Sequence, residues 1–125
     1  MTSDPYDRLP ERIRTLLATL GHSPDQCLAT LKSIYKPNET IPRLWVVVVT
    51  DALLLCSTHR TRGLFRKFAP EDLNTVRARQ CTLEIIPRRL DAEQIDLPFD
   101  PSDAKRVQAL AHAAHRALCA RGSAR

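Results

Sequence analysis

The sequence has 125 residues, of which 43% are hydrophobic and 26% are charged, the balance of a single globular domain with a modest core. Its longest unbroken apolar run, Leu44 to Val49, is far shorter than the roughly 20 residues that a membrane-spanning helix needs. The N-terminus has no basic patch followed by an apolar stretch, so no signal peptide is expected. These features exclude an integral helical membrane protein and predict a cytoplasmic location.

The cysteines and glycines exclude several kinds of site. The four cysteines, Cys27, Cys56, Cys81 and Cys119, are widely spaced and include no C-x-x-C pair. We interpret them as small buried side chains in a reducing compartment, without a disulfide framework. The three glycines form neither a G-x-G-x-x-G pattern nor a P-loop, so a nucleotide site is not expected and no cofactor is predicted.

Positive charge is concentrated in one part of the chain. The net charge is +5, and residues 59–89, with eight basic and three acidic side chains, account for all of the excess. Such a block attracts anionic membranes, nucleic acid or an acidic protein, although basic side chains that merely solvate polar strand faces give the same pattern. The candidate binding residues in this block are Arg60, Arg62, Arg66, Lys67, Arg77 and Arg79.

The chain begins with a predicted amphipathic helix from Asp7 to Leu20, in which apolar residues recur at spacings of three and four. Gly21 is suited to its end. The next segment, Ser23 to Tyr35, has helical spacing but strand-forming residues in its second half. We favour a strand over Thr30 to Tyr35, because it completes the set of strands described next.

Six short strands are expected to follow in meander order, from their β-branched residues and from alternation of apolar and polar side chains. They are Leu44 to Val49, Leu53 to Thr58, Thr61 to Phe68, Leu73 to Arg79, Cys81 to Ile86 and Ile95 to Phe99. In the third, Leu64 and Phe68 are expected on one face and Phe65 on the other. In the fourth, Arg77 and Arg79 alternate with apolar residues and are expected to share the outer face.

A last helix is predicted from Ala104 to about Ala120, with Ser102 and Asp103 as caps and a short tail after it. Rolling seven strands into a closed barrel and plugging one end with this helix covers the strand edges. The predicted fold is therefore α+β and mainly β. It is one domain, 1–125, made of an N-terminal helical extension (1–22), a seven-stranded barrel with its C-terminal helix (23–120) and a tail (121–125).

The stretch from Leu44 to Ser57 resembles the bacterial pleckstrin-homology-like domains. In that family a hydrophobic strand ends in a Thr-Asp turn, here Thr50-Asp51, and the chain re-enters as a leucine-rich strand, here Leu53-Leu54-Leu55. Phe68 and the acidic turn after it are similar to another step of the family pattern. The resemblance covers roughly residues 28–118, so the N-terminal helix lies outside it.

The resemblance implies a non-enzymatic binding module. It implies a groove between the fifth strand and the C-terminal helix, here Leu73 to Arg79 and Ala104 to Ala120, where a partner's extended segment adds as a strand. It also implies phosphate-binding basic residues on the first two strands. This chain offers only Lys32, Lys36 and Arg43 there, and Ala52 follows the Thr-Asp turn, so a phosphoinositide pocket is not expected.

Two other sets of residues have the side-chain types of a reactive site. Ser57 and His59 point to the same side of an extended strand, but Asp51 lies at its far end and cannot orient the histidine. His112, His115 and Cys119 share a helix face but lack a fourth ligand, so no metal site is predicted. Direct nucleic-acid binding is not expected either, because the aromatics of the basic block, Phe65 and Phe68, are expected in the core.

Three functions therefore remain open, in decreasing order of support. The first is a protein-interaction module, with self-association as one form of it. The second is a peripheral binder of anionic lipid or another anionic ligand, which uses the arginines of residues 59–89 and depends strongly on salt. The third is a small enzyme.

Overall fold

The computed structural model describes residues 5–119, which form two antiparallel sheets and two helices. In both sheets each strand pairs with its neighbour in the sequence. The first sheet has the order β1 (Cys27–Lys32), β2 (Trp45–Val49), β3 (Ala52–Cys56) and β4 (Leu64–Phe68). The second has the order β5 (Leu73–Arg79), β6 (Thr82–Pro87) and β7 (Ile95–Pro98). The predicted α+β class and the seven strands are confirmed.

The helices are α1 (Glu11–Thr19) and α2 (Ala104–Ala114), and α2 continues into a π-helical turn, His115–Cys119. The predicted first helix began too early, because Pro10 lacks an N–H and α1 begins just after it. Residues 5–8 instead form a 3-10 turn, as do residues 24–26, 70–72 and 101–103. The predicted end at Ala120 and the tail lie outside the described residues. In the described part of the chain, neither helix is long and apolar enough to span a bilayer.

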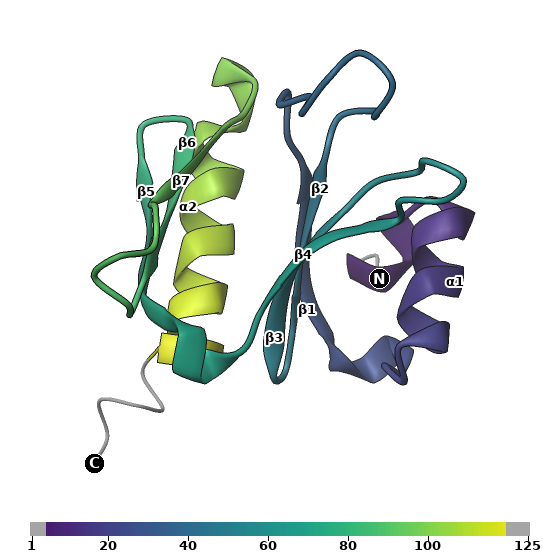
Figure 1. Cartoon of the computed structure of the whole chain (residues 1–125), viewed down its shortest axis with the longest axis horizontal. Helices are drawn as coiled ribbons and strands as arrows, with labels where there is room; N and C mark the ends of the chain where they lie inside the picture. The colour runs from purple at the N-terminus through teal and green to yellow at the C-terminus, as the bar shows by residue number, and fades with distance from the viewer. Residues whose placement is uncertain (1–4, 120–125) are drawn as a thin grey trace.

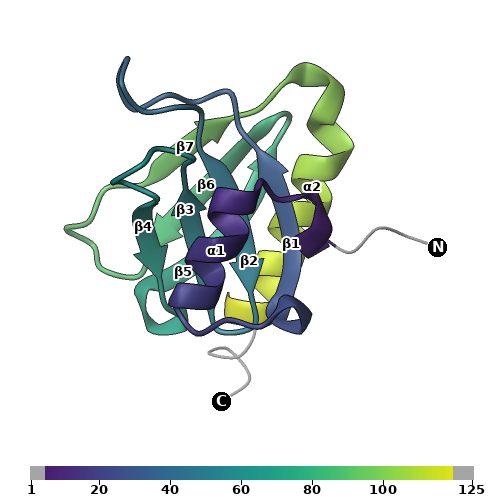
Figure 2. The ribbon, with the colours of Figure 1, turned by 90° about the vertical axis from the view of Figure 1, so that its right-hand side faces the viewer.

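The elements are stacked in layers. Figure 1 shows α1 on one face of the four-stranded sheet, and α2 with the three-stranded sheet on the other. Figure 2, turned by 90°, shows α1 in front of the four-stranded sheet. The larger core cluster fills the space between the two sheets and α2, and the smaller one lies beneath α1. The N-terminal helix is therefore part of the packed structure.

The two sheets do not close into the predicted barrel. The chain leaves the first sheet after β4 and turns through Ala69–Asp72, where the Ala69 N–H donates to the Asp72 carboxylate at 3.0 Å. At another corner, the Ile34 N–H donates to the Pro98 carbonyl at 3.0 Å and links the sheets by one backbone bond. α2 lies between β1 and β5 and contacts both strands. The helix thus replaces strand pairing there.

Strands β2 and β3 are buried on both faces. Val46, Val48, Leu53 and Leu55 belong to the core between the sheets, whereas the intervening residues of these strands pack under α1. A strand buried on both sides reads as a continuous apolar run without alternation. The four valines therefore require a second covering layer, and α1 supplies it with its buried residues Ile13 and Leu17, together with Leu9 just before the helix.

The predicted faces of β4 are wrong for both Leu64 and Phe65 relative to Phe68, because the strand contains a bulge. Its register changes between the pairs Leu55–Arg66 and Cys56–Leu64, which leaves Phe65 as the extra residue. Phe65 therefore packs with Phe68 in the core between the sheets, and Leu64 packs under α1. The bulge also places Arg66 at the rim of the space between the sheets.

The strand after α1 is confirmed, but it lies three residues earlier than predicted. β1 ends at Lys32 because Ser33 is buried and bends the chain: its hydroxyl donates to the Leu44 carbonyl at 2.8 Å and accepts the Tyr35 N–H at 3.2 Å. At the β5–β6 turn, Gln80 takes a positive φ of 57°, as a tight two-residue reversal requires. The predicted hairpin of the valine-rich and leucine-rich strands is confirmed, since β2 pairs with β3.

Candidate functional site

The outer face of β5 carries Arg77 and Arg79, as their alternation with Val76 and Ala78 predicts. Both guanidinium groups meet one carboxylate: Arg77 Nε donates to Glu84 Oε1 at 2.5 Å, and Arg79 Nε lies 3.5 Å from Glu84 Oε2. The Glu84 side chain is only 10% exposed and lies opposite Arg77 in the β5–β6 register. In the β6–β7 register, Asp96 of β7 lies opposite Glu84.

The charge of this face is therefore balanced in part by the chain itself. Glu84 is a buried carboxylate that needs cationic partners, and the two arginines supply them. Arg66 does not join them, since it lies in the other sheet with its guanidinium 4.9 Å from the Phe68 ring centroid. Lys67 pairs with Leu54, on the α1 side of that sheet. The block of residues 59–89 is thus divided among separate surfaces.

The remaining candidates, Arg60 and Arg62, lie in the loop between β3 and β4. Ser57 holds this loop closed: its N–H donates to the Gly63 carbonyl at 2.7 Å, its hydroxyl donates to the Arg62 carbonyl at 2.7 Å, and it accepts the His59 N–H at 3.1 Å. His59 Nδ1 in turn accepts the Thr61 N–H at 3.2 Å. Ser57 and His59 are therefore used to shape the loop and do not pair as nucleophile and base.

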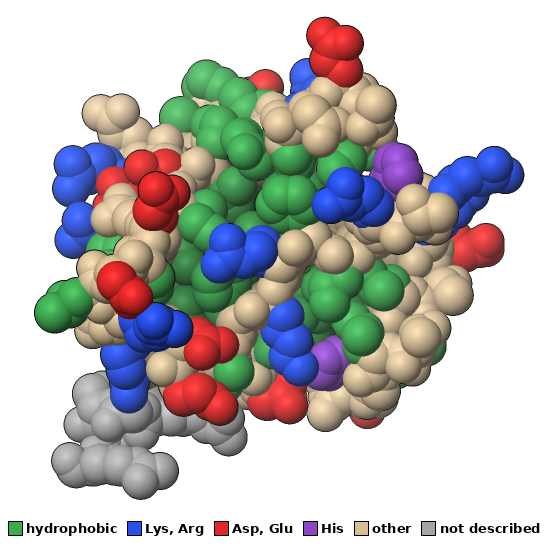
Figure 3. Space-filling view, viewed as in Figure 1, with side chains coloured by type: hydrophobic (Ala, Val, Ile, Leu, Met, Phe, Trp, Pro, Cys, Tyr) green, Lys and Arg blue, Asp and Glu red, His purple; other side chains and the backbone are tan. Residues whose placement is uncertain are grey.

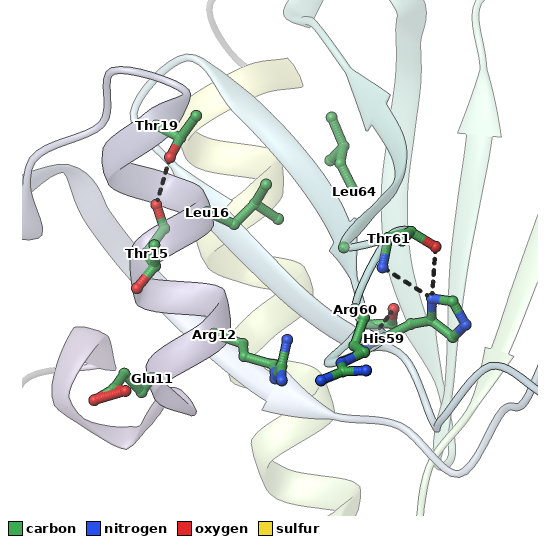
Figure 4. A pocket seen from close by; sticks show the side chains of 11 residues that line it. Glu11, Arg12, Thr15, Leu16, Thr19, His59, Arg60, Thr61 and Leu64 are labelled. Carbon is green, nitrogen blue, oxygen red and sulfur yellow. Dashed lines mark hydrogen bonds between the residues drawn. The ribbon is translucent and has the colours of Figure 1, made fainter.

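A polar cleft of about 510 Å³ separates this loop from α1. Arg12 and Leu16 line it from the helix, and His59, Arg60 and Leu64 line it from the loop side (Figure 4). The sequence placed Arg60 among the candidates but missed Arg12. No local signal marks Arg12, because it reaches the cleft only through the packing of α1 on the sheet.

The predicted groove between β5 and the C-terminal helix is occupied by the helix's own last turn. The Val76 N–H on β5 donates to the Cys119 thiol, and the Thr75 hydroxyl lies 3.4 Å from His115 Nδ1. Burial raises the pKa of Cys119, and the Val76 hydrogen bond and Arg88 only partly offset this. Within residues 5–119 no three His, Cys, Asp or Glu side chains are grouped to hold a metal.

An open groove lies instead between β1 and α2. It consists of two adjoining hollows of about 260 and 470 Å³, which share Leu28 of β1 and Ala109 and Ala113 of α2. Leu28 is 41% exposed although it is a large aliphatic side chain. Basic side chains surround the groove: Arg8, Arg106, His112 and Arg116.

A third hollow, of about 270 Å³, lies where the two sheets diverge. Its walls are mainly apolar, from Leu44, Leu55, Phe65 and Leu97, and Arg66 lies at its edge. Figure 3 shows hydrophobic side chains gathered on this face between the sheets. Tyr35, also in its lining, is 38% exposed. The sequence indicated these residues as strand and core residues but gave no sign that they border an opening.

No protein-family model matches the sequence, and no curated protein matches it. Function is therefore inferred from the surfaces themselves. Among the three hollows described above, the groove beside β1 and the cleft beside α1 are each lined by more than one arginine able to select an anionic group. The first is apolar with a basic rim, and the second is basic with an apolar wall.

Proposed function

We propose that this chain is a pleckstrin-homology-like protein-interaction module, and that its groove between β1 and α2 receives an extended segment of a partner protein. The observation that carries the proposal is an edge strand lying beside a hollow lined by alanines, with Leu28 left 41% exposed. The seven strands followed by one helix are in the order that the family resemblance implies. The two sheets and α2 correspond to an opened form of the barrel that the family resemblance implies.

The backbone of β1 supports strand addition. β1 is the first strand of its sheet and pairs with β2 alone. Among the described residues, the backbone-to-backbone hydrogen bonds of β1 run to β2, and its other edge faces α2 and the 3-10 turn of residues 5–8. An edge strand of this kind is a template for another strand, and a neighbouring hollow then selects the side chains of the added segment.

The charge around the groove indicates the occupant. Arg106 Nη1 is paired with Asp103 at 2.8 Å, and Arg8 and Arg116 line the two ends of the hollow. The floor of the groove is apolar and leaves room for a ligand, because Ala109 and Ala113 have only methyl side chains. The complementary ligand is an extended segment with apolar side chains that enter the groove and carboxylates that flank them.

The experiment is selection of peptides from a random library displayed on phage, with the full chain immobilised. The enriched peptides should contain apolar residues with flanking Asp or Glu. Ala109→Glu places a carboxylate in the groove, so it should weaken binding of a selected peptide at least tenfold in fluorescence anisotropy. Gln108→Glu is the matched control, because it makes the same exposed side chain one position along α2 and outside the groove.

The two variants separate the outcomes. Equal binding by Ala109→Glu and wild type would place the peptide elsewhere and refute the groove. Failure to enrich any peptide, together with a sedimentation mass well above 14.1 kDa that Ala109→Glu returns to the monomer value, would identify a second copy of the chain as the occupant. A strict monomer that enriches no peptide would refute the proposal.

A further inference from the structure

The cleft between α1 and the β3–β4 loop brings two arginines together without a carboxylate between them. Arg12 and Arg60 line it from opposite sides, and Figure 4 shows their guanidinium groups extending toward each other. The one acidic residue in the lining, Glu11, points away from both in the same view. Two like charges that converge in a hollow repel each other, so an anion between them is stabilised by both.

The arginine from the loop is held in place by a fixed backbone. Ser57 bonds to three backbone groups of residues 59–63, and the Thr61 N–H donates to His59 Nδ1 at 3.2 Å. Gly63 lies against α1 so closely that a Cβ there would be 3.4 Å from Leu16 Cδ2. The spacing between loop and helix is therefore set before any ligand binds, and less conformational entropy is lost on binding.

The charge in this cleft differs from that on β5. Arg77 and Arg79 share the carboxylate of Glu84, whereas neither Arg12 nor Arg60 makes an ion pair within the described residues. Arg62, on the same loop, is exposed and adds positive charge nearby without lining the cleft. The cleft is therefore a place where two arginines without an ion pair converge, one of them from residues 59–89.

We infer that this cleft binds a phosphate monoester, with the phosphate held between Arg12 and Arg60. Forked guanidinium groups that approach from opposite sides match a tetrahedral group, which presents oxygens in several directions, better than a planar carboxylate. A volume of about 510 Å³ is more than one phosphate fills. The rest of the molecule then lies against Leu16 and Leu64, which form the apolar wall. The site is independent of the groove beside β1.

The test is a titration of the ¹⁵N-labelled full chain, followed by amide chemical shifts. The probes are inorganic phosphate and O-phosphoserine for a soluble ligand, and vesicles of phosphatidylcholine with or without phosphatidic acid for a lipid headgroup. Both soluble probes should shift the amides of residues 59–61 and of the first turn of α1. Arg12→Gln and Arg60→Gln should each weaken phosphoserine binding at least tenfold, while Arg62→Gln, with the same loss of charge, changes it less than twofold.

Sedimentation with the vesicles distinguishes a lipid headgroup from a soluble phosphate monoester as the ligand. Sedimentation with phosphatidic acid vesicles that Arg60→Gln abolishes and Arg62→Gln retains would assign the site to a lipid headgroup, and phosphoserine binding alone would assign it to a soluble ligand. An equal loss in Arg60→Gln and Arg62→Gln would mean diffuse attraction and overturn the inference. The absence of shifts at residues 59–61 with every probe would also overturn it. Leu16 remains unchanged in all variants, so the packing of α1 is preserved.

Discussion

Strands β1 and β5 are both edge strands beside the same helix, yet the edge of β5 is covered and a groove lies open beside β1. At β5 the last turn of the helix closes the edge, because the Cys119 thiol accepts the Val76 N–H and His115 reaches Thr75. At β1 a groove stays open, and Leu28 is 41% exposed above Ala109 and Ala113. One helix thus protects one edge and leaves the other available.

The size of the side chains on the helix explains the difference. The face of α2 toward β1 carries alanines at a spacing of four, Ala109, Ala113 and Ala117, and methyl groups do not fill the space beside a strand. The end of the helix toward β5 carries a buried leucine, Leu118, and a thiol that reaches the strand backbone. A helix that contacts two edges therefore protects only the edge that its larger side chains reach.

The largest expected effect is the loss of the anchor at the closed edge. Leu118→Ala removes a side chain that is 1% exposed and should lower the free energy of unfolding by about 2–5 kcal/mol, measured with urea. Leu28→Ala at the open edge should lower it by about 1 kcal/mol or less, because much of that side chain already contacts water. Equal losses in the two variants would contradict the difference between the edges.

A smaller effect is expected from the hydrogen bond that closes β5. Cys119→Ala leaves the Val76 N–H without its acceptor, which should lower the free energy of unfolding by about 1–3 kcal/mol and speed hydrogen exchange at Val76. Cys119→Ser supplies another acceptor and should restore most of the protection at that amide. Unchanged exchange at Val76 in the alanine variant would show that the thiol does not close the edge.

Thiol reactivity should distinguish the two edges directly. Cys119 is buried and its pKa is raised by burial, so it should react slowly with iodoacetamide at pH 8. A cysteine introduced in the open groove by Leu28→Cys should react at least tenfold faster, and mass spectrometry of tryptic peptides measures both rates. A slow reaction at position 28 would mean that the groove is covered.

The smallest effect is a decline in stability at alkaline pH. Burial raises the pKa of Cys119 above 9.0, so the thiol contributes stability below pH 9 that is lost as the unfolded chain ionises first. Burial, with a contribution from Cys27, raises the pKa of Cys56 from 9.0 to about 12. The free energy of unfolding therefore also decreases between pH 9 and about 12 because of Cys56. The free energy of unfolding should decrease above pH 9, less steeply in Cys119→Ser. A stability that rises with pH there would contradict the assignment.

Local patterns predicted the strands well and their surroundings poorly. Alternation placed Arg77 and Arg79 on one outer face, but nothing along the chain showed that both meet the carboxylate of Glu84 until β5 and β6 were paired. Charge counted along a sequence is not the charge available in space. The same limit hid Arg12, which meets Arg60 only after α1 packs on the sheet.

Other features did leave a signal in the sequence. The unbroken run from Leu44 to Val49 indicates a strand covered on both faces, and α1 is the only amphipathic helix left outside the core around α2 in the described chain. The bulge at Phe65 left no signal, because an extra residue in an irregular loop-to-strand segment does not disturb any apolar pattern.

The most direct test of the proposed function is hydrogen exchange of the ¹⁵N-labelled full chain with and without a peptide selected from the library. Addition of a strand predicts that amides of β1, between Cys27 and Lys32, become at least tenfold more protected, while the amide of Val76 on β5 does not change. Protection that appears at β5 or in the β3–β4 loop, with β1 unchanged, would contradict the assignment of the groove beside β1 as the binding site.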